Sequence, residues 1–199
     1  MVYIVGLGPG HSDYILPIAK KTMENSEIIL GFNRAIESIE HIHGEKLPLN
    51  SLTSILDYIE KNKDKEISII ASGDPCFYGI TNYIKKNFTG NIEVIPGISS
   101  FQYFMSKLCK IWNGIHLGSL HGREEEFLDT IKKGQSGVFL TDKNNSPSNL
   151  CKLLYDNNLE CTVYVGENLS YPDEVITKGT PEELKDREFS GIAVIYVEI

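Results

Sequence analysis

The stretch "IIASGDPCFYG", residues 69–79, joins an apolar run to a turn made of glycine, aspartate and proline. The apolar run predicts a buried strand that stops abruptly at Gly73. The acidic Asp74 then stands between the two residue types that constrain a backbone most, glycine and proline. Two interpretations stay open for this stretch: Asp74 caps a following helix, or the turn is shaped to hold a ligand.

Two further stretches follow the same order of an apolar run, a Gly/Pro loop and small residues. They are "YIVGLGPGH", residues 3–11, and "VIPGISSFQ", residues 94–102. If the three strands are parallel, their carboxyl ends share one edge of a sheet, where open α/β folds bind ligands. Small residues let the backbone approach a ligand closely. Since none of the loops is basic, we expect a compact polar ligand rather than a phosphate-rich one.

The first loop does not match the common nucleotide-binding fingerprints. Its glycines, Gly6, Gly8 and Gly10, form G-x-G-x-G, whereas a dinucleotide site needs G-x-G-x-x-G and an acidic residue after the next strand. The next apolar run ends in "IILGFNR", which has no acidic residue. A phosphate-binding lysine after the glycines is also missing. Taken alone, this loop is equally well explained as a tight strand-to-helix turn.

Apolar runs alternate with amphipathic segments along most of the chain, which indicates an α/β protein with a parallel sheet in its first half. Residues 52–61 and 124–133 have the apolar spacing of helices. A boundary near residues 110–114 predicts two α/β lobes, residues 1–110 and 115–199, with a cleft between them. The expected strands are Val2–Leu7, Ile28–Leu30, Ile67–Ala71, Ile92–Ile95, Ile115–Ser119, Gly137–Leu140, Thr162–Val165, Glu174–Thr177 and Ile192–Val197.

Composition weighs against several classes of function. The chain has 199 residues and a formal net charge of −8, which disfavours binding to nucleic acid. It lacks an apolar run of the roughly 20 residues that a membrane helix needs, and Met1 leads directly into the first strand, so we expect a cytoplasmic protein. The cysteines show no zinc-binding spacing, which predicts buried free thiols and no protein-bound metal.

Together, "VGLGPG", "SGDPCFYG" and "VIPGISSFQ", in this order and spacing, resemble the tetrapyrrole methylases, which use S-adenosylmethionine as methyl donor. The resemblance runs over essentially the whole chain. Within that family, "GSLHGR" (118–123) and "VGENLSYPDEVITKGTPEEL" (165–184) are similar to the branch that methylates C5 of a corrin precursor in cobalamin biosynthesis. The resemblance implies a C-methyltransferase that has a parallel sheet in the N-terminal lobe and a mixed sheet in the C-terminal lobe. It also implies that the protein forms a homodimer. A separate, decarboxylating C15-methyltransferase is a further partner that the resemblance suggests.

The resemblance also implies which residues meet the donor, although it names no catalytic base. Pro9 and its loop would border the cleft, and the later two loops would contact the donor. The second lobe would add contacts from two short apolar strings. The implied donor-binding residues are Pro9, Gly73, Asp74, Phe77, Ser99, Ser100, Leu140, Thr141 and Ala193.

The macrocycle carries several carboxylates, so an acidic protein needs local basic groups to bind it. The candidates are His11, Arg34, His121 and Arg123, of which Arg123 is favoured because a guanidinium pairs well with carboxylates. The alternative for Arg123 is a solvated arginine at a helix start. Two other functions stay open: the same fold acting on another macrocycle carbon, ribosomal RNA or a modified histidine, and a non-catalytic nucleotide-binding module.

Overall fold

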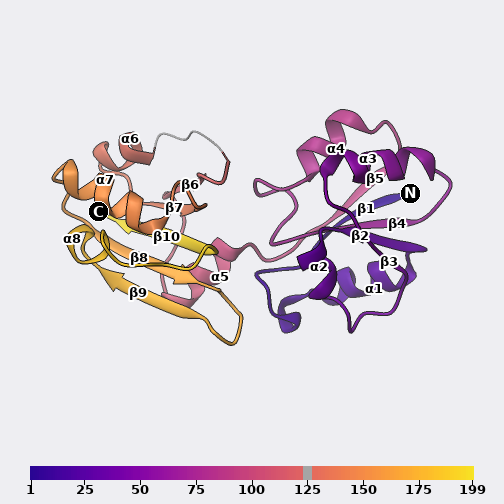
Figure 1. Ribbon diagram of the computed structural model, residues 1–199, viewed down its shortest axis with the longest axis horizontal. Coiled ribbons are helices and arrows are strands. Elements are labelled where there is room, and N and C mark those ends of the chain that lie inside the picture. Colours follow the sequence, from indigo (N-terminus) through magenta and orange to yellow (C-terminus); the bar gives the residue numbers. More distant parts are fainter. Residues whose placement is uncertain (123–126) are drawn as a thin grey trace. The chain divides into compact units, whose positions relative to one another are not determined.

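The computed structural model describes residues 1–122 and 127–199, which form two compact units, 1–99 and 100–199 (Figure 1). Arg123 and the start of the helix expected over residues 124–133 lie outside the described residues.

The first unit is built on a parallel sheet with strand order β3-β2-β4-β1-β5. In the centre, Val2 of β1 is aligned with Ile67 of β4 on one side and with Ile92 of β5 on the other. The predicted parallel sheet is therefore confirmed. The strands are β1 (Val2–Gly6), β2 (Ile28–Gly31), β3 (Lys46–Pro48), β4 (Ile67–Ala71) and β5 (Ile92–Ile95).

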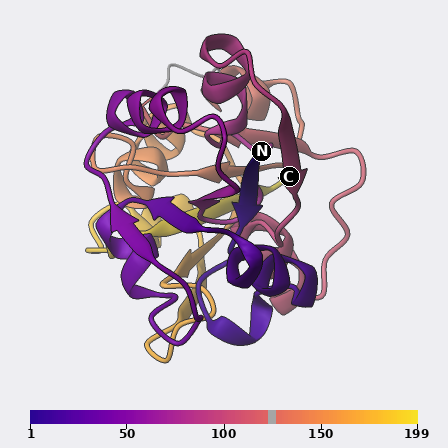
Figure 2. The ribbon, with the colours of Figure 1, turned by 90° about the vertical axis from the view of Figure 1, so that its right-hand side faces the viewer.

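Helices cover both faces of this sheet, which explains why its central strands are apolar on both sides. Figure 2 shows α1 and α3 on opposite sides of the strands. Side chains alternate along β1: Ile4 packs in the cluster that includes α3 and α4, and Val5 packs in the cluster that includes α1. The helical segments are η1 (Ser12–Tyr14), α1 (Pro17–Asn25), α2 (Asn33–Glu37), α3 (Leu52–Lys61) and α4 (Thr81–Asn87).

The second unit contains a mixed sheet with strand order β6-β7-β10-β8-β9. Strand β6 is parallel to β7, whereas β10 is antiparallel to both of its neighbours and β8 pairs with β9 as an antiparallel hairpin. The expected mixed sheet is confirmed. The strands are β6 (His116–Ser119), β7 (Gly137–Leu140), β8 (Thr162–Glu167), β9 (Val175–Gly179) and β10 (Ala193–Glu198).

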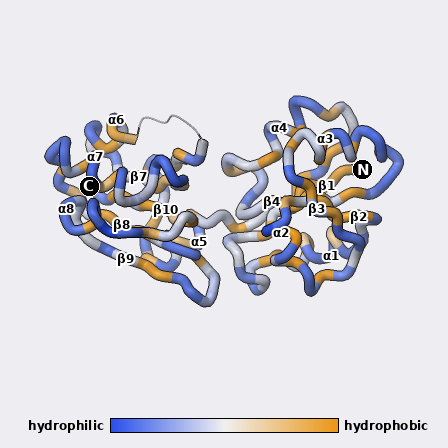
Figure 3. Tube along the Cα trace, viewed as in Figure 1, coloured by the Kyte–Doolittle hydropathy of each residue, from blue (hydrophilic) through white to orange (hydrophobic). Residues whose placement is uncertain are grey.

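Local signals in the sequence start helix α7 of the second unit. The side chain of Ser146 accepts a hydrogen bond from the amide of Asn149, and Pro147 takes the first helical position of α7. The core of this unit includes Phe139 and Ile195 on the sheet and Leu150 on α7. Figure 3 shows hydrophobic residues concentrated on the strands of both units. The helices are α5 (Ser100–Lys107), α6 (Phe127–Lys132), α7 (Pro147–Asp156) and α8 (Pro181–Leu184).

Two expectations about local structure were wrong. Strand β3, Lys46–Pro48, was not predicted, because three residues that include a lysine and a proline carry no apolar pattern. The cysteines are not uniformly buried: Cys76 and Cys109 are exposed in loops, whereas Cys151 on α7 is fully buried. Burial raises the pKa of the Cys151 thiol to about 12, which keeps it protonated and unreactive.

Candidate active site

The loops that follow β1 and β4 are joined by backbone hydrogen bonds at the carboxyl edge of the first sheet. The amide of Gly73 donates to the carbonyl of Gly8 at 2.8 Å, and the amide of Gly8 donates to the carbonyl of Gly73 at 3.3 Å. Both glycines have positive φ angles, +83° at Gly8 and +66° at Gly73, which other residues adopt only with strain. The pairing that ties these loops together therefore depends on glycine.

The loop after β5 packs directly against the other two through its backbone. A Cβ atom on Gly97 would lie 2.2 Å from the carbonyl oxygen of Gly73 and 2.9 Å from the Cα of Gly6. A Cβ on Gly6 would lie 2.6 Å from the amide nitrogen of Gly97. Such distances leave no room for a side chain. The prediction that the three loops gather at one sheet edge is confirmed.

Asp74 connects the second and third loops through its carboxylate. One oxygen accepts the amide of Cys76 at 2.8 Å, and the other accepts the amide of Gly97 at 3.2 Å. The next helix, α4, begins only at Thr81. The helix-cap interpretation of Asp74 is therefore wrong, and its carboxylate instead holds two loops in register.

The segment that follows Asp74 is tightly folded and carries a strained residue. Tyr78 has a φ of +54°, a conformation that is costly for an aromatic residue and often marks a functional site. Its ring lies 5.0 Å from that of Phe77 in an edge-to-face arrangement. A Cβ on Gly79 would lie 2.4 Å from the carbonyl oxygen of Pro75. Tyr78 was missed from the sequence, since nothing local distinguishes it from its aromatic neighbour.

The other candidates of the first unit lie at the same sheet edge. Pro9 is buried in the first loop, and Ser99, only 3% exposed, ends the third loop. Ser100, the next residue in the chain, is the first residue of α5 and belongs to the second unit. His11, also in the first loop, accepts the amide of Asp13 through Nδ1 at 3.2 Å and so caps η1. Arg34 is exposed on α2, after β2, and β4 separates that strand from β1.

In the second unit, the sheet brings three of the predicted donor-binding residues together. Leu140 ends β7 opposite Val194 of β10. The hydroxyl of Thr141 donates to the carbonyl of Ala193 at 2.8 Å, and the amide of Thr141 points to the same oxygen at 3.4 Å. Thr141 and Ala193 are each 7% exposed. These three residues meet at one corner of the sheet, where β7 ends and β10 begins, and Leu140 is half-buried there.

His121 lies beside this corner, in the turn that follows β6. The amide of Leu120 donates to the carbonyl of Leu140 at 2.8 Å, and Nδ1 of His121 lies 3.4 Å from the carbonyl oxygen of Thr141. The amide of Gly122 donates to Asp142 at 2.8 Å. That bond, with those from Asn145 and Asn144, holds the pKa of the Asp142 carboxyl below its usual value. Asp142 was not among the predicted site residues, because its role depends on a partner 20 residues away in the chain.

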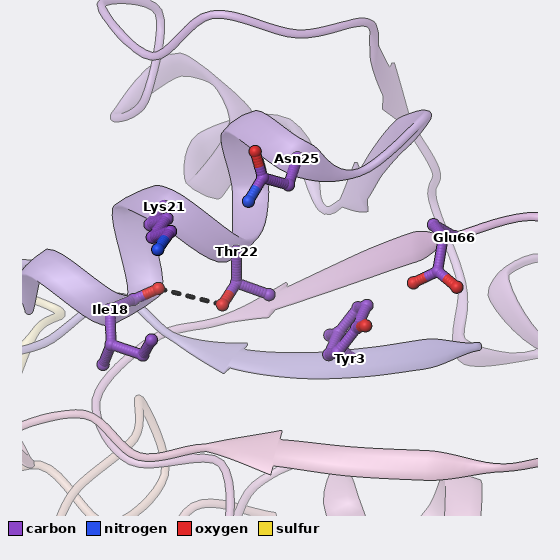
Figure 4. Close-up of a pocket in the computed structure, with 6 residues that line it drawn as sticks. All are labelled: Tyr3, Ile18, Lys21, Thr22, Asn25 and Glu66. Carbon is purple, nitrogen blue, oxygen red and sulfur yellow. Dashed lines mark hydrogen bonds between the residues drawn. The ribbon is translucent and has the colours of Figure 1, made fainter.

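A small cavity of about 140 Å³ lies elsewhere in the first unit (Figure 4). Ile18, Lys21, Thr22 and Asn25 line it from α1. Tyr3 and Glu66 complete it near the amino ends of β1 and β4, away from the glycine loops. A hydrogen bond to Glu66, with burial, raises the pKa of the Tyr3 hydroxyl. The position of this cavity separates it from the predicted donor site.

Among residues 1–122 and 127–199, no three His, Cys, Asp or Glu side chains are grouped so that they could hold a metal ion. Over the same residues, no helix has the length and hydropathy needed to cross a membrane.

Comparison with known proteins identifies the family. A sequence profile of the Tetrapyrrole (Corrin/Porphyrin) Methylases matches residues 1–185. The chain belongs to this family of methyltransferases. Its glycine loops and the Asp74 bridge are therefore features of a tetrapyrrole methylase.

Two relatives and one solved structure illustrate the similarity. This tetrapyrrole methylase is 35% identical to the probable cobalt-precorrin-7 C(5)-methyltransferase of Methanocaldococcus jannaschii, over 100% of the chain and 98% of the relative. It is 28% identical to the cobalt-precorrin-7 C(5)-methyltransferase of Salmonella typhimurium, over 88% of the chain and 89% of the relative. The crystal structure of the precorrin-6Y methylase (cbiE) of Archaeoglobus fulgidus has the same fold, with a TM-score of 0.78 at 24% identity, covering 100% of this chain and 97% of that one.

Proposed function

We propose that this tetrapyrrole methylase transfers a methyl group from S-adenosylmethionine to C5 of cobalt-precorrin-7. The observation that carries this proposal is the 35% identity to a probable cobalt-precorrin-7 C(5)-methyltransferase over the whole chain. A uroporphyrin-III C-methyl transferase of Thermus thermophilus, similar in fold at a TM-score of 0.77 and 18% identity, was crystallised with S-adenosyl homocysteine. That complex supports the choice of donor.

The glycine loops of the first unit fit such a donor. Their backbones approach one another so closely that side chains are excluded at Gly6 and Gly97, which leaves peptide groups, rather than cationic side chains, to meet a ligand. No lysine or arginine stands in residues 6–11, 72–79 or 96–100. A donor with an amino acid and a ribose, but no phosphate, suits this lining.

The proposed donor-binding residues lie in loops and at strand ends of each sheet. The loops that contain Pro9, Gly73 and Phe77 would contact the donor, with Asp74 fixing their arrangement. Ser99 and Ser100 would add small polar groups. In the second unit, Leu140, Thr141 and Ala193, which meet at one corner of the sheet, are the further proposed donor contacts.

Positioning is the main contribution of the protein to catalysis. The bound donor supplies a methyl group on a positively charged sulfur, which is displaced by an electron-rich carbon of the macrocycle. Holding the reacting atoms in line contributes about 7–11 kcal/mol to lowering such a barrier. The tightly packed loops suit this task because they cannot readily change shape. A side-chain nucleophile is not required.

The macrocycle carboxylates would be bound by local basic groups on a chain whose net charge is −8. His11, Arg34, His121 and Arg123 are the proposed contacts. His121 is exposed on its turn, and His11 and Arg34 follow strands of the first sheet. Cobalt would enter as part of the substrate, and the protein itself would hold no metal.

We also propose that the chain acts as a homodimer in the cytoplasm and that a separate C15-methylating enzyme acts on the same series of macrocycles. Light scattering coupled to size-exclusion chromatography measures the mass of the assembly. A mass of twice 22.3 kDa is expected. A mass of 22.3 kDa at micromolar concentration would contradict the dimer.

Calorimetric titration tests the donor. S-adenosylhomocysteine and S-adenosylmethionine are expected to bind at one site per chain, while ATP and NAD are expected not to bind. Binding of ATP or NAD in place of the methyl donor would favour the non-catalytic nucleotide-binding alternative. Methylation assays with other macrocycles, with ribosomal RNA and with a protein that carries the modified histidine then separate C5 methylation from other activities of the fold.

A further inference from the structure

The turn at residues 120–122 is held on both sides by side chains of the loop that follows β7. The carboxylate of Asp142 accepts the amide of Gly122 at 2.8 Å, and the side-chain amide of Asn145 donates to the carbonyl of Leu120 at 3.0 Å. These two bonds flank His121 in the sequence. The peptide groups on either side of the histidine are therefore fixed by residues that lie more than 19 positions further along the chain.

The loop that makes these bonds is itself braced. The other oxygen of Asp142 accepts the amides of Asn144 and Asn145 at 2.9 and 2.7 Å. From the first turn of α7, the side-chain amide of Asn149 donates to the carbonyl of Asn144 at 2.9 Å. The Asp142–Asn145 loop is thus held by its own hydrogen bonds, independently of those to the turn. Through Asn149 it also links the turn that contains His121 to α7.

The turn is exposed, so burial does not explain why it needs this support. Both His121 and Gly122 are exposed, and exposed peptide groups can bond to water at little cost. Gly122 has a φ of +62°, while a Cβ there would meet nothing within 4 Å. Glycine is therefore required for the backbone conformation and not for space. The turn therefore keeps one defined conformation, although hydrogen bonds to water would allow an exposed turn to adopt many conformations.

We propose that Asp142 and Asn145 are positioning residues that hold the 120–122 turn so that His121 can bind a carboxylate of the macrocycle. This inference rests on the proposed function, since it takes the macrocycle as the ligand. Asp142 acts through the backbone: both of its oxygens accept backbone amides, and a carboxylate would repel the acidic substrate. Asn145 acts through the carbonyl of Leu120.

Hydrogen exchange and kinetics together test this proposal on the full-length protein. Asp142→Ala is expected to speed amide exchange at Gly122 at least tenfold. It is also expected to raise KM for the cobalt-precorrin-7 macrocycle about tenfold and to leave the Kd for S-adenosylhomocysteine within twofold. Asp142→Asn retains one of the two acceptor oxygens and is expected to give a KM between those of the wild type and Asp142→Ala. Asn145→Ala is expected to raise KM by a smaller factor.

Glu183→Ala is the matched control. Glu183 also accepts a backbone amide, that of Thr180 at 2.7 Å, but it does so in the capping box of α8. This variant removes a carboxylate from the same unit and is expected to lower Tm without changing KM or exchange at Gly122. A similar KM change in Glu183→Ala would mean that Asp142 matters only for stability, and it would overturn the proposal.

Two other outcomes would overturn the positioning role. Unchanged exchange at Gly122 in Asp142→Ala would show that the carboxylate does not hold the turn. Faster exchange with an unchanged KM would show that the turn does not bind the macrocycle. Failure of the proposed function is separate and visible in the wild type, because a protein that binds the donor but methylates no corrin precursor contradicts the acceptor before any variant is compared.

Discussion

The two sheet edges that carry the candidate residues are held together in different ways. In the first unit, backbone packs against backbone at Gly6, Gly73 and Gly97, and a single carboxylate, that of Asp74, links two of the loops. In the second unit, the loops after β6 and β7 are separate segments joined by side chains, chiefly those of Asp142 and Asn145. Glycine contacts allow no substitution without a clash, whereas a side-chain bond can be weakened in steps.

This difference suits the two ligands of the proposed reaction. A methyl donor is the same small molecule in every turnover, and a rigid backbone surface can match it. In this proposal, a macrocycle with many carboxylates would be held by exposed groups such as His121, and neighbouring side chains would set the position of that histidine. Glycine substitutions in the first edge should therefore remove donor binding, whereas substitutions of Asp142 and Asn145 in the second should change substrate binding by degrees.

Gly97→Ala should have the largest effect. The added Cβ would lie 2.2 Å from the carbonyl oxygen of Gly73, and backbone cannot move aside as a flexible side chain can. We expect the free energy of unfolding to fall by about 3 kcal/mol and binding of S-adenosylhomocysteine to be lost. Chemical denaturation and calorimetry measure the two effects.

Gly191→Ala is the control for this variant, because a Cβ there would meet nothing within 4 Å. Gly191→Ala should leave the free energy of unfolding and the binding of S-adenosylhomocysteine unchanged. If Gly97→Ala bound S-adenosylhomocysteine as tightly as Gly191→Ala does, the close packing of the three loops would not be required for donor binding.

Asp74→Ala should have the next largest effect. It leaves the amides of Cys76 and Gly97 without their carboxylate acceptor, so we expect a loss of about 2 kcal/mol in the free energy of unfolding. Calorimetry should show donor binding weakened about tenfold, which corresponds to about 1.4 kcal/mol. Asp74→Asn keeps one acceptor oxygen, so its stability and donor affinity should lie between those of the wild type and those of Asp74→Ala. Unchanged donor affinity in Asp74→Ala would remove Asp74 from the donor site.

Thr141→Val should have a smaller effect, on the corner of the second sheet. Valine keeps the shape of threonine but loses the hydroxyl that donates to the carbonyl of Ala193 at 2.8 Å. We expect the free energy of unfolding to fall by about 1 kcal/mol. Thermal denaturation of this variant beside the wild type provides the measurement, and an unchanged Tm would show that the bond is not needed at this corner.

The pH dependence of Asp142 should be the smallest effect. Backbone hydrogen bonds, first that from Gly122, lower its pKa in the folded state below the ordinary value of 3.8. A lowered folded pKa means that the contribution to stability is present above pH 3.8 and is lost as the pH falls through the folded pKa. The difference in unfolding free energy between wild type and Asp142→Asn, measured by urea denaturation, should stay constant above about pH 5 and shrink below about pH 4. A difference that grows on acidification would contradict this assignment.

The sequence predicted more of the first edge than of the second. Its strands end in Gly/Pro loops that can be recognised locally, and parallel pairing then brings those loops together without further information. The role of Asp74 was only partly predictable, since its bond to Gly97 depends on how close two loops lie in space. Asp142 and Asn145 gave no local signal beyond a polar turn before Pro147, because their partners lie in another segment. Strand β3 was missed for the related reason that its three residues pair with β2 without an apolar pattern.

The most direct test of the central claim is to incubate the purified protein with cobalt-precorrin-7 and S-adenosylmethionine carrying a ¹³C-labelled methyl group, and to locate the label by NMR. We predict a macrocycle with one new labelled methyl group, at C5, and an equal amount of S-adenosylhomocysteine. A label at another carbon would contradict the C5 assignment. An unlabelled macrocycle, from protein that binds S-adenosylhomocysteine, would contradict the proposed acceptor.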